Sequence, residues 1–319
     1  MTTVIPPAPQ THTAHPHTSF SSRFALTFAL FGVWIVWGAM YLITHKVLTE
    51  APPLWMAAVR FTVAGASLFT ILRLRKAPMP TARQWRNAAL TGVIMMGLAS
   101  GSTITAQTLN SSGIASVVAS TATLWFALLG VAVGMRPSKL EWLAVLLGVA
   151  GVAVLFSDQT SGVNPWGLAL GSFAALTWAA GSVLSQRLDL PSGWMRTATQ
   201  MLSGGVFLLL LSTLRGETPL FTPSPSVALA WATAILGGIV GFGSYTWLLA
   251  RGKESLAISY AYVNPLVALG LGGLIGGEHM STQEIVGIGI ILAAVVTTTV
   301  ASSSASSASS ASSASSASS

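Results

Sequence analysis

Long apolar blocks, each about the length needed to cross a bilayer, constrain this chain more than any other feature. Of its 319 residues, 52% are hydrophobic and only 7% carry a charge. A soluble domain has about 25% charged residues, so this composition excludes the two soluble domains that the length would otherwise suggest. Apolar runs of about 20 residues are typical of transmembrane helices. The sequence therefore predicts an all-α, polytopic membrane protein.

We expect ten transmembrane helices joined by short connections, many of which contain Pro or Gly. Their predicted spans are 24–44, 54–72, 87–107, 113–134, 140–156, 165–186, 194–214, 227–249, 256–276 and 282–300. They form two five-helix units, residues 24–156 and 165–300. Residues 1–23 are polar and contain three histidines, and residues 301–319 repeat Ala-Ser-Ser. Both ends are predicted to be disordered tails; adventitious metal binding is the alternative for the histidines.

Basic residues alternate between the two predicted sides of the membrane. With the N-terminus inside, twelve lie on the inner side: Arg23, Arg73, Arg75, Lys76, Arg83, Arg86, Arg136, Lys139, Arg187, Arg196, Arg251 and Lys253. Only Lys46 and Arg215 lie outside, and Arg60 lies within a span. This distribution predicts that both termini are cytoplasmic. Because the bases are spread over six segments with no single patch, it also argues against nucleic acid as a partner.

The two halves contain recurring motifs. Pro52-x-x-Trp55-Met56 recurs as Pro191-x-x-Trp194-Met195, and Gly130-x-x-x-Gly134 recurs as Gly273-x-x-x-Gly277. Several matches at a near-constant offset indicate duplication, although Gly-x-x-x-Gly alone is also a general helix-packing motif. Because each unit has an odd number of helices, the second inserts upside down. The sequence thus predicts two inverted five-helix repeats, an architecture common in secondary transporters.

The chain resembles the ten-helix EamA-like branch of the drug/metabolite transporter superfamily over about residues 24–300. The resemblance rests on Trp37-Gly38-x-x-Tyr41, on Pro53 and Arg60, and on three motifs of the second half. Those three are Arg251-Gly252-Lys253-Glu254-Ser255-Leu256-Ala257, Tyr262-x-Asn264-Pro265 and Gly277-Glu278. In the first half Thr123 and Met135 stand where the repeat would have Pro and Glu, so a role that needs both copies of that Glu is in doubt.

Enzymatic chemistry finds no support in the sequence. No Gly-rich loop ends in Gly-Lys-Ser/Thr, as an ATP-binding site would require, and the few acids and histidines are far apart. The chain has no Cys, which removes thiolate chemistry and Cys-based metal sites. We therefore expect no catalytic residues, no metal site and no cofactor.

Polar and aromatic residues at membrane depth are the candidates for a solute pathway, and the resemblance implies a central cavity between the helices that carry them. The candidates for substrate binding are Trp37, Tyr41, Arg60, Ser102, Gln107, Ser116, Ser120, Thr121, Trp178, Ser182, Tyr245, Tyr262 and Asn264. For each Ser or Thr, helix packing is an equal alternative. A lining of hydroxyls and aromatic rings favours a neutral or zwitterionic solute with an apolar part.

Three positions have more specific predicted roles. Arg60 is a candidate partner for a substrate carboxylate, with snorkelling or a structural hydrogen bond as the alternative. Pro265, beside Asn264, is a candidate hinge, because it removes one backbone donor from its helix; a plain kink is the alternative. Glu278 is a candidate proton-coupling acid, although the alternative, a structural cap on the turn into the tenth helix, is the favoured interpretation of this position.

We therefore expect a secondary transporter that is not driven by ATP and exports amino acids or related metabolites by alternating access. The alternatives are efflux of cationic drugs, which the lack of an acid in residues 24–44 disfavours, and a non-transporting membrane scaffold. Expected partners are the lipid bilayer, a small solute and protons as a candidate coupling ion, with the chain as a monomer or dimer. The resemblance implies the inner membrane of a bacterium.

Overall fold

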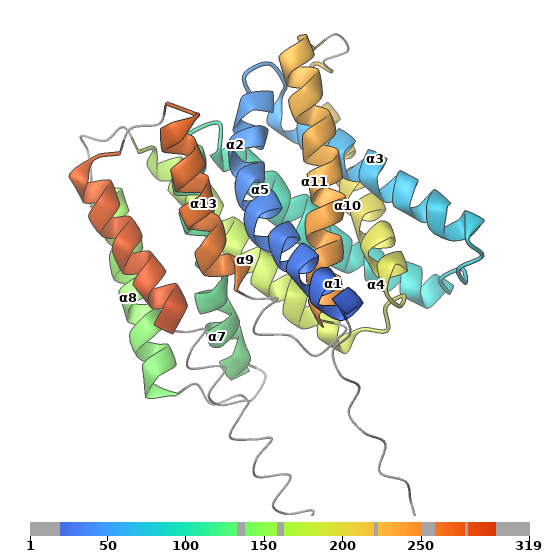
Figure 1. Cartoon of the computed structure of the whole chain (residues 1–319), viewed down its shortest axis with the longest axis horizontal. Coiled ribbons are helices and arrows are strands. Elements are labelled where there is room, and N and C mark those ends of the chain that lie inside the picture. The colour runs from blue at the N-terminus through green and yellow to red at the C-terminus, as the bar shows by residue number, and fades with distance from the viewer. Residues whose placement is uncertain are drawn as a thin grey trace, which may run out of the picture.

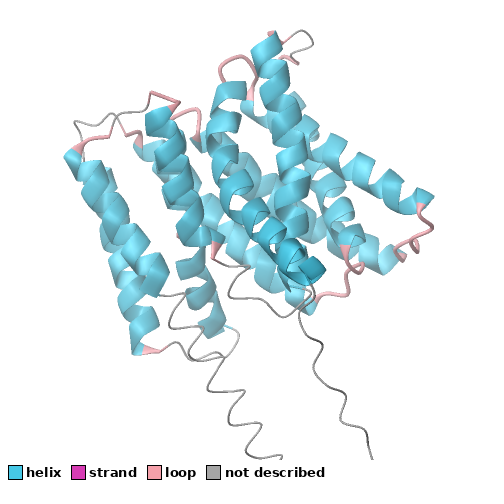
Figure 2. Cartoon of the chain, in the orientation of Figure 1, coloured by secondary structure: helices cyan, strands magenta, loops and turns pink. Residues whose placement is uncertain are grey.

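A bundle of helices forms the whole of the described structure (Figure 2). The computed structural model describes residues 20–132, 138–157, 163–219, 223–249, 259–277 and 280–297. Within these ranges every regular element is helical. The predicted terminal tails, the 251–257 motif and Glu278 lie outside the described residues.

The first half contains five crossings, two of which are interrupted by a π-helical segment. Its elements are α1 (Phe20–Phe31), η1 (Gly32–Val36), α2 (Trp37–Val47), α3 (Pro53–Leu74), α4 (Ala82–Gly92), η2 (Val93–Ala99), α5 (Ser100–Ala106), α6 (Ser112–Ser120), α7 (Ala122–Ala132) and α8 (Lys139–Ser157). The second half contains α9 (Pro165–Arg187), α10 (Trp194–Leu214), α11 (Pro225–Leu249), α13 (Tyr260–Leu274) and the helix Thr282–Thr297.

Membrane-spanning character is clear in most of these crossings. Among the described residues, seven helices are long and apolar enough to cross a bilayer. The helices α8, α13 and Thr282–Thr297 occupy the positions of the other three predicted spans. Large apolar side chains such as Leu146, Leu210 and Leu236 are exposed on the outside of the bundle, where lipid would cover them. The predicted all-α membrane fold is confirmed.

Local sequence explains where several helices begin. Pro53, Pro165 and Pro225 each occupy the first residue of a helix, a position that lacks an intrahelical donor bond and suits the fixed φ of proline. At the start of α4, Thr81 Oγ1 accepts from Gln84 N at 3.2 Å, and Gln84 Oε1 accepts from Thr81 N at 3.1 Å. This reciprocal pair is a capping box.

The two halves pack so that the first crossing of each half contacts the third crossing of the other (Figure 1). The second crossings of the two halves, α3 and α10, lie against each other along their length. The first crossing of the first half packs through α2 on α11, and the first crossing of the second half, α9, packs on α5. The fourth crossings meet through α6 and α13. This exchange of partners is what a twofold relation between inverted repeats produces.

Candidate functional site

A cavity of about 140 Å³ lies between the two halves. It is bounded by α2, α3, α5 and α6 of the first half and by α9, α11 and α13 of the second. Its lining consists of Trp37, Met40, Tyr41, Thr44, Arg60, Phe61, Ala99, Ser100, Thr103, Ile104, Gln107, Ala119, Ala174, Ala175, Trp178, Phe242, Tyr260 and Asn264. Six predicted site residues are therefore brought together here: Trp37, Tyr41, Arg60, Gln107, Trp178 and Asn264.

One end of the cavity is aromatic. The ring of Trp37 is at the centre of this cluster, with its centroid 4.9 Å from that of Phe242, 5.1 Å from that of Tyr260 and 6.4 Å from that of Trp178. All three rings meet it edge to face, the geometry that aromatic quadrupoles favour. Tyr245 supports the cluster from behind, with its centroid 5.8 Å from that of Trp37, and it does not line the cavity.

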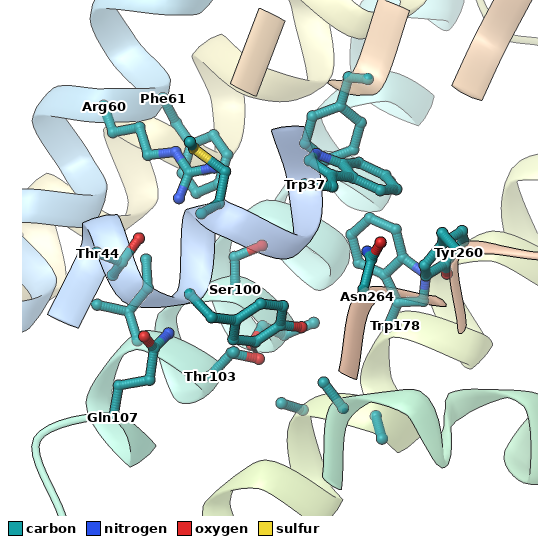
Figure 3. A pocket seen from close by; sticks show the side chains of 18 residues that line it. Trp37, Thr44, Arg60, Phe61, Ser100, Thr103, Gln107, Trp178, Tyr260 and Asn264 are labelled. Carbon is teal, nitrogen blue, oxygen red and sulfur yellow. Dashed lines mark hydrogen bonds between the residues drawn. The ribbon is translucent and has the colours of Figure 1, made fainter. Parts of the chain in front are cut away.

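The other end contains the polar side chains of Thr44, Arg60 and Gln107 (Figure 3). Arg60 is only 8% exposed, and Gln107 is 2% exposed. Among the described residues, the buried Nε atom of Arg60 has no hydrogen-bond partner, and Cζ of its guanidinium lies 5.3 Å from the centroid of the Phe61 ring. The Oε1 atom of Gln107 is likewise buried without a partner there. No Asp or Glu is part of the described lining.

An unpaired buried guanidinium is unusual, because removing a charge from water costs on the order of several kcal/mol unless a partner compensates for it. A guanidinium carries five N–H donors in a planar fork; Arg60 lines the cavity, and its Nε has no acceptor among the described residues. The arrangement fits a planar anion such as a carboxylate, which accepts two parallel hydrogen bonds from Arg.

The predicted hydroxyls on α6 lie elsewhere. Ser116 Oγ donates to Gly113 O at 2.7 Å, Ser120 Oγ to Val117 O at 2.6 Å, and Thr121 Oγ1 to Val118 O at 2.6 Å. All three are buried and outside the cavity lining. Their hydroxyls are thus bonded to carbonyls of their own helix, the packing alternative that the sequence left open.

Sequence reasoning missed four lining residues that carry a hydroxyl, Thr44, Ser100, Thr103 and Tyr260, and selected Ser102 instead. Ser102 does not line the cavity, whereas its neighbours Ser100 and Thr103 do. Residues 100, 103, 104 and 107 share one helical face, so Gln107 was the signal that identifies this face. Thr44 was missed although it lies one turn beyond Tyr41 on the face that carries Trp37.

Asn264 connects α13 to the π-helical segment η1. With its amide oriented to satisfy both groups, Nδ2 donates to Val33 O at 2.8 Å and to Trp34 O at 3.1 Å. Nearby, Trp34 Nε1 donates to Ser259 Oγ at 2.7 Å. π-Helical turns occur frequently at functional sites, and this one ends directly before Trp37. Asn264 therefore holds the segment that positions the central aromatic ring.

The remaining predicted residues are not part of the described lining of the cavity. Pro265 lies within α13, whose helix continues on both sides of it, and its hinge role stays a prediction. Ser182 is buried, with no hydrogen-bond partner for its hydroxyl among the described residues. The side chain of Tyr262 and all of Glu278 lie outside the described part. No group of three potential metal ligands occurs in the described residues.

Comparison with known proteins identifies the family. The EamA-like transporter family matches residues 24–157 and, a second time, residues 165–300. The chain belongs to this family. The predicted resemblance to EamA-like drug/metabolite transporters is confirmed, and the protein is an integral membrane transporter of small molecules.

Several relatives and one solved structure agree with this assignment. The "uncharacterized inner membrane transporter YedA" of Escherichia coli is 39% identical over 88% of this chain and 92% of its own length. Protein PecM of Dickeya dadantii is 27% identical over 82% and 88%. A "probable amino-acid metabolite efflux pump" of Escherichia coli is 24% identical over 82% and 90%. A crystal structure with 21% identity, which covers 87% of this chain and 98% of its own, has a TM-score of 0.62 and supports the fold.

Proposed function

We propose that this transporter exports small metabolites that carry a carboxylate, such as amino acids or related compounds, by alternating access without ATP. In this proposal the central cavity is the solute site and Arg60 binds the carboxylate. The observation that carries it is the buried Arg60 side chain, which lines the cavity and whose Nε has no hydrogen-bond partner among the described residues. A bound carboxylate would compensate the buried charge through a bidentate pair.

The rest of the cavity supports a small amphipathic solute. The Trp37 cluster supplies contact area for the apolar part of the solute, as the apolar walls of other ligand sites do. The volume of about 140 Å³ is below the roughly 300–1,000 Å³ of drug-sized sites. Export as the direction is supported by the relative named as an amino-acid metabolite efflux pump. Cytoplasmic termini and the bacterial inner membrane remain part of the proposal.

Efflux of cationic drugs is the second candidate, and the cavity disfavours it. A cation needs an acidic partner or an unopposed aromatic cage. The described lining contains no acid, and it places the Arg60 guanidinium at one end. Repulsion from this positive charge should exclude cationic drugs. The charge of the cavity lining therefore distinguishes the two candidate functions.

The function is tested with the purified protein in proteoliposomes, by counterflow of an amino acid and of its uncharged-carboxyl analogue, the amino acid amide. We expect exchange of the acid and at least a hundredfold slower exchange of the amide, because the amide removes the charge that pairs with Arg60. A cationic dye serves as the third solute. Exchange of the amide and the dye in preference to the acid would contradict the proposal.

Gln107 should select what lies next to the carboxylate. Its buried Oε1 has no donor among the described residues, so a solute with a neighbouring N–H or O–H would satisfy it, whereas a 2-oxo acid would not. We expect the wild-type protein to prefer a 2-amino or 2-hydroxy acid over the matching 2-oxo acid by about tenfold or more, and Gln107→Leu to lose this preference. Ser102→Ala, off the cavity face, is the control and should keep it.

Proton coupling is tested by imposing a pH gradient across the same proteoliposomes. If protons drive export, the gradient should produce accumulation of the carboxylate solute against its concentration. The Glu278→Gln variant should abolish accumulation while leaving counterflow intact, because counterflow needs no net proton movement. Transport that ignores the pH gradient and produces no accumulation would indicate facilitated diffusion.

A further inference from the structure

Glu217, in the turn after α10, caps a helix that belongs to the other half. The helix α3 starts at Pro53 and has no side-chain cap of its own. Its first N–H groups, those of Leu54 and Trp55, need an acceptor from outside the helix. Leu54 N donates to Glu217 Oε1 at 3.3 Å, and Trp55 N donates to Oε2 at 2.7 Å. Ser212 Oγ adds a third bond at 2.9 Å. The carboxylate thus ties the second half to the N-terminus of α3, where negative charge is favoured.

Glu50 makes the reciprocal contact at the same end of the molecule, the upper end in Figure 1. It lies between α2 and α3, and it accepts from Ser224 N at 3.0 Å and from Ser224 Oγ at 2.6 Å. Ser224 directly precedes α11, in the second half. The side-chain and backbone hydrogen bonds from Ser224, helped by Lys46, lower the pKa of Glu50. Its carboxylate is therefore ionised throughout the neutral range.

The opposite end of the molecule contains a corresponding contact. Asp189 Oδ1 accepts from Gln84 Nε2 at 3.2 Å, and Asp189 O accepts from Asn87 Nδ2 at 2.9 Å. Glu50 and Asp189 occupy equivalent places, each two residues before the proline of the repeated Pro-x-x-Trp-Met motif. Each contacts the N-terminal end of the third crossing of the other half: Glu50 contacts Ser224, directly before α11, and Asp189 contacts Gln84 and Asn87 of α4.

The ends differ in one respect. Glu217 adds a second carboxylate at the end that contains Glu50, whereas residues 75–81, the corresponding connection of the first half, contain no acid. This end is also the one nearer to Arg60, since Arg60 follows Trp55 by less than two turns of the helix that Glu217 caps.

We propose that Glu50 and Glu217 form a latch that closes one end of the transport pathway, that Asp189 is its repeat-related counterpart at the other end, and that the two latches release alternately. Rocking of inverted repeats must separate the halves at one end while it joins them at the other. Contacts between a carboxylate and a helix N-terminus suit this task because they form and break without repacking the apolar core. The second carboxylate, Glu217, makes the Glu50 end the more tightly closed.

Thiol labelling tests the latch cleanly, because the natural sequence has no Cys. The probe is Thr44→Cys, which faces the cavity and is only 1% exposed. A membrane-impermeant methanethiosulfonate is added to one side of sealed vesicles. Separate reference variants, Thr49→Cys at the Glu50 end and Arg83→Cys at the Asp189 end, are exposed and show which end of the protein faces the reagent. Adding Glu50→Gln and Glu217→Gln to the Thr44→Cys variant should raise the labelling rate of Cys at position 44 about tenfold when the reagent is on the Thr49 side. Adding Asp189→Asn should raise it from the Arg83 side.

The control is Glu284→Gln, which removes a carboxylate cap of similar geometry from within one half. Glu284 Oε2 accepts from Ser281 N at 2.6 Å, and Ser281 Oγ accepts from Glu284 N at 3.0 Å. This variant should leave the labelling from either side unchanged. Where the double variant fails to fold, Ser224→Ala and Ser212→Ala remove donors of the same latch and should raise the rate by a smaller factor. Unchanged labelling in the folded latch variants, or a rise from the wrong side, overturns the proposal.

Discussion

Arg60→Met should abolish transport of the carboxylate solute and leave the protein at least as stable as the wild type. The two expectations follow from one observation, that Arg60 is buried and that its Nε has no hydrogen-bond partner within the described structure. A structural Arg loses its hydrogen bonds when it is replaced, so the fold suffers. An Arg that awaits a ligand carries an uncompensated desolvation cost, and an apolar side chain of similar length removes that cost.

Counterflow in proteoliposomes and thermal unfolding of the purified protein measure the two effects separately. We expect transport to fall at least a hundredfold and the stabilisation by saturating solute to disappear, while Tm without solute stays constant or rises. Arg60→Lys should retain part of the activity, because it keeps the charge and loses the bidentate geometry. A large fall in Tm for Arg60→Met, together with normal transport by the folded fraction, would show that Arg60 is structural.

The fold could be predicted from the sequence because lipid imposes simple rules on it. Each crossing needs an apolar stretch of about 20 residues, and the Pro-x-x-Trp-Met motif repeats in order, so helix number and duplication were readable. The π-helical breaks within the crossings could not be predicted from the sequence. Segments η1 and η2 interrupt the first and third crossings, and a π-turn changes neither the length nor the hydropathy of a span. Its carbonyls are satisfied by tertiary partners such as Asn264, which no local pattern records.

The site was partly predictable for a related reason. Trp37, Tyr41 and Arg60 are conspicuous in an apolar span, and the cavity contains all of them. Serine and threonine are ambiguous, since a hydroxyl in a helix can donate to its own backbone. Ser116 does so at 2.7 Å from Gly113 O, and its sequence context hardly differs from that of Ser100, which lines the cavity. Only the rotation of each helix separates the two cases, and tertiary packing sets that rotation.

Glycine packing at the centre of the molecule gives the largest expected effect on stability. Gly65 of α3 and Gly205 of α10 lie at nearly equivalent positions of the two halves, where these helices cross. A methyl group added at Gly205 would lie 2.7 Å from Thr62 N and 3.1 Å from Phe61 C. One added at Gly65 would lie 2.7 Å from Leu202 N. These are backbone atoms, so rotation of a side chain cannot relieve the contact, and the helices must separate.

Gly205→Ala should therefore destabilise the protein by about 1–3 kcal/mol, the usual cost of overpacking, even though Ala is by itself the better helix former. Gly270→Ala is the matched control within α13, because a methyl group there meets no described atom within 4 Å; it should be neutral or stabilising by up to about 1 kcal/mol. Thermal unfolding in detergent measures both variants. Equal Tm values for the two would mean that the α3–α10 crossing is looser than its backbone contacts indicate. A fall confined to Gly205→Ala, accompanied by slower counterflow, would show that the close crossing next to Arg60 also supports transport.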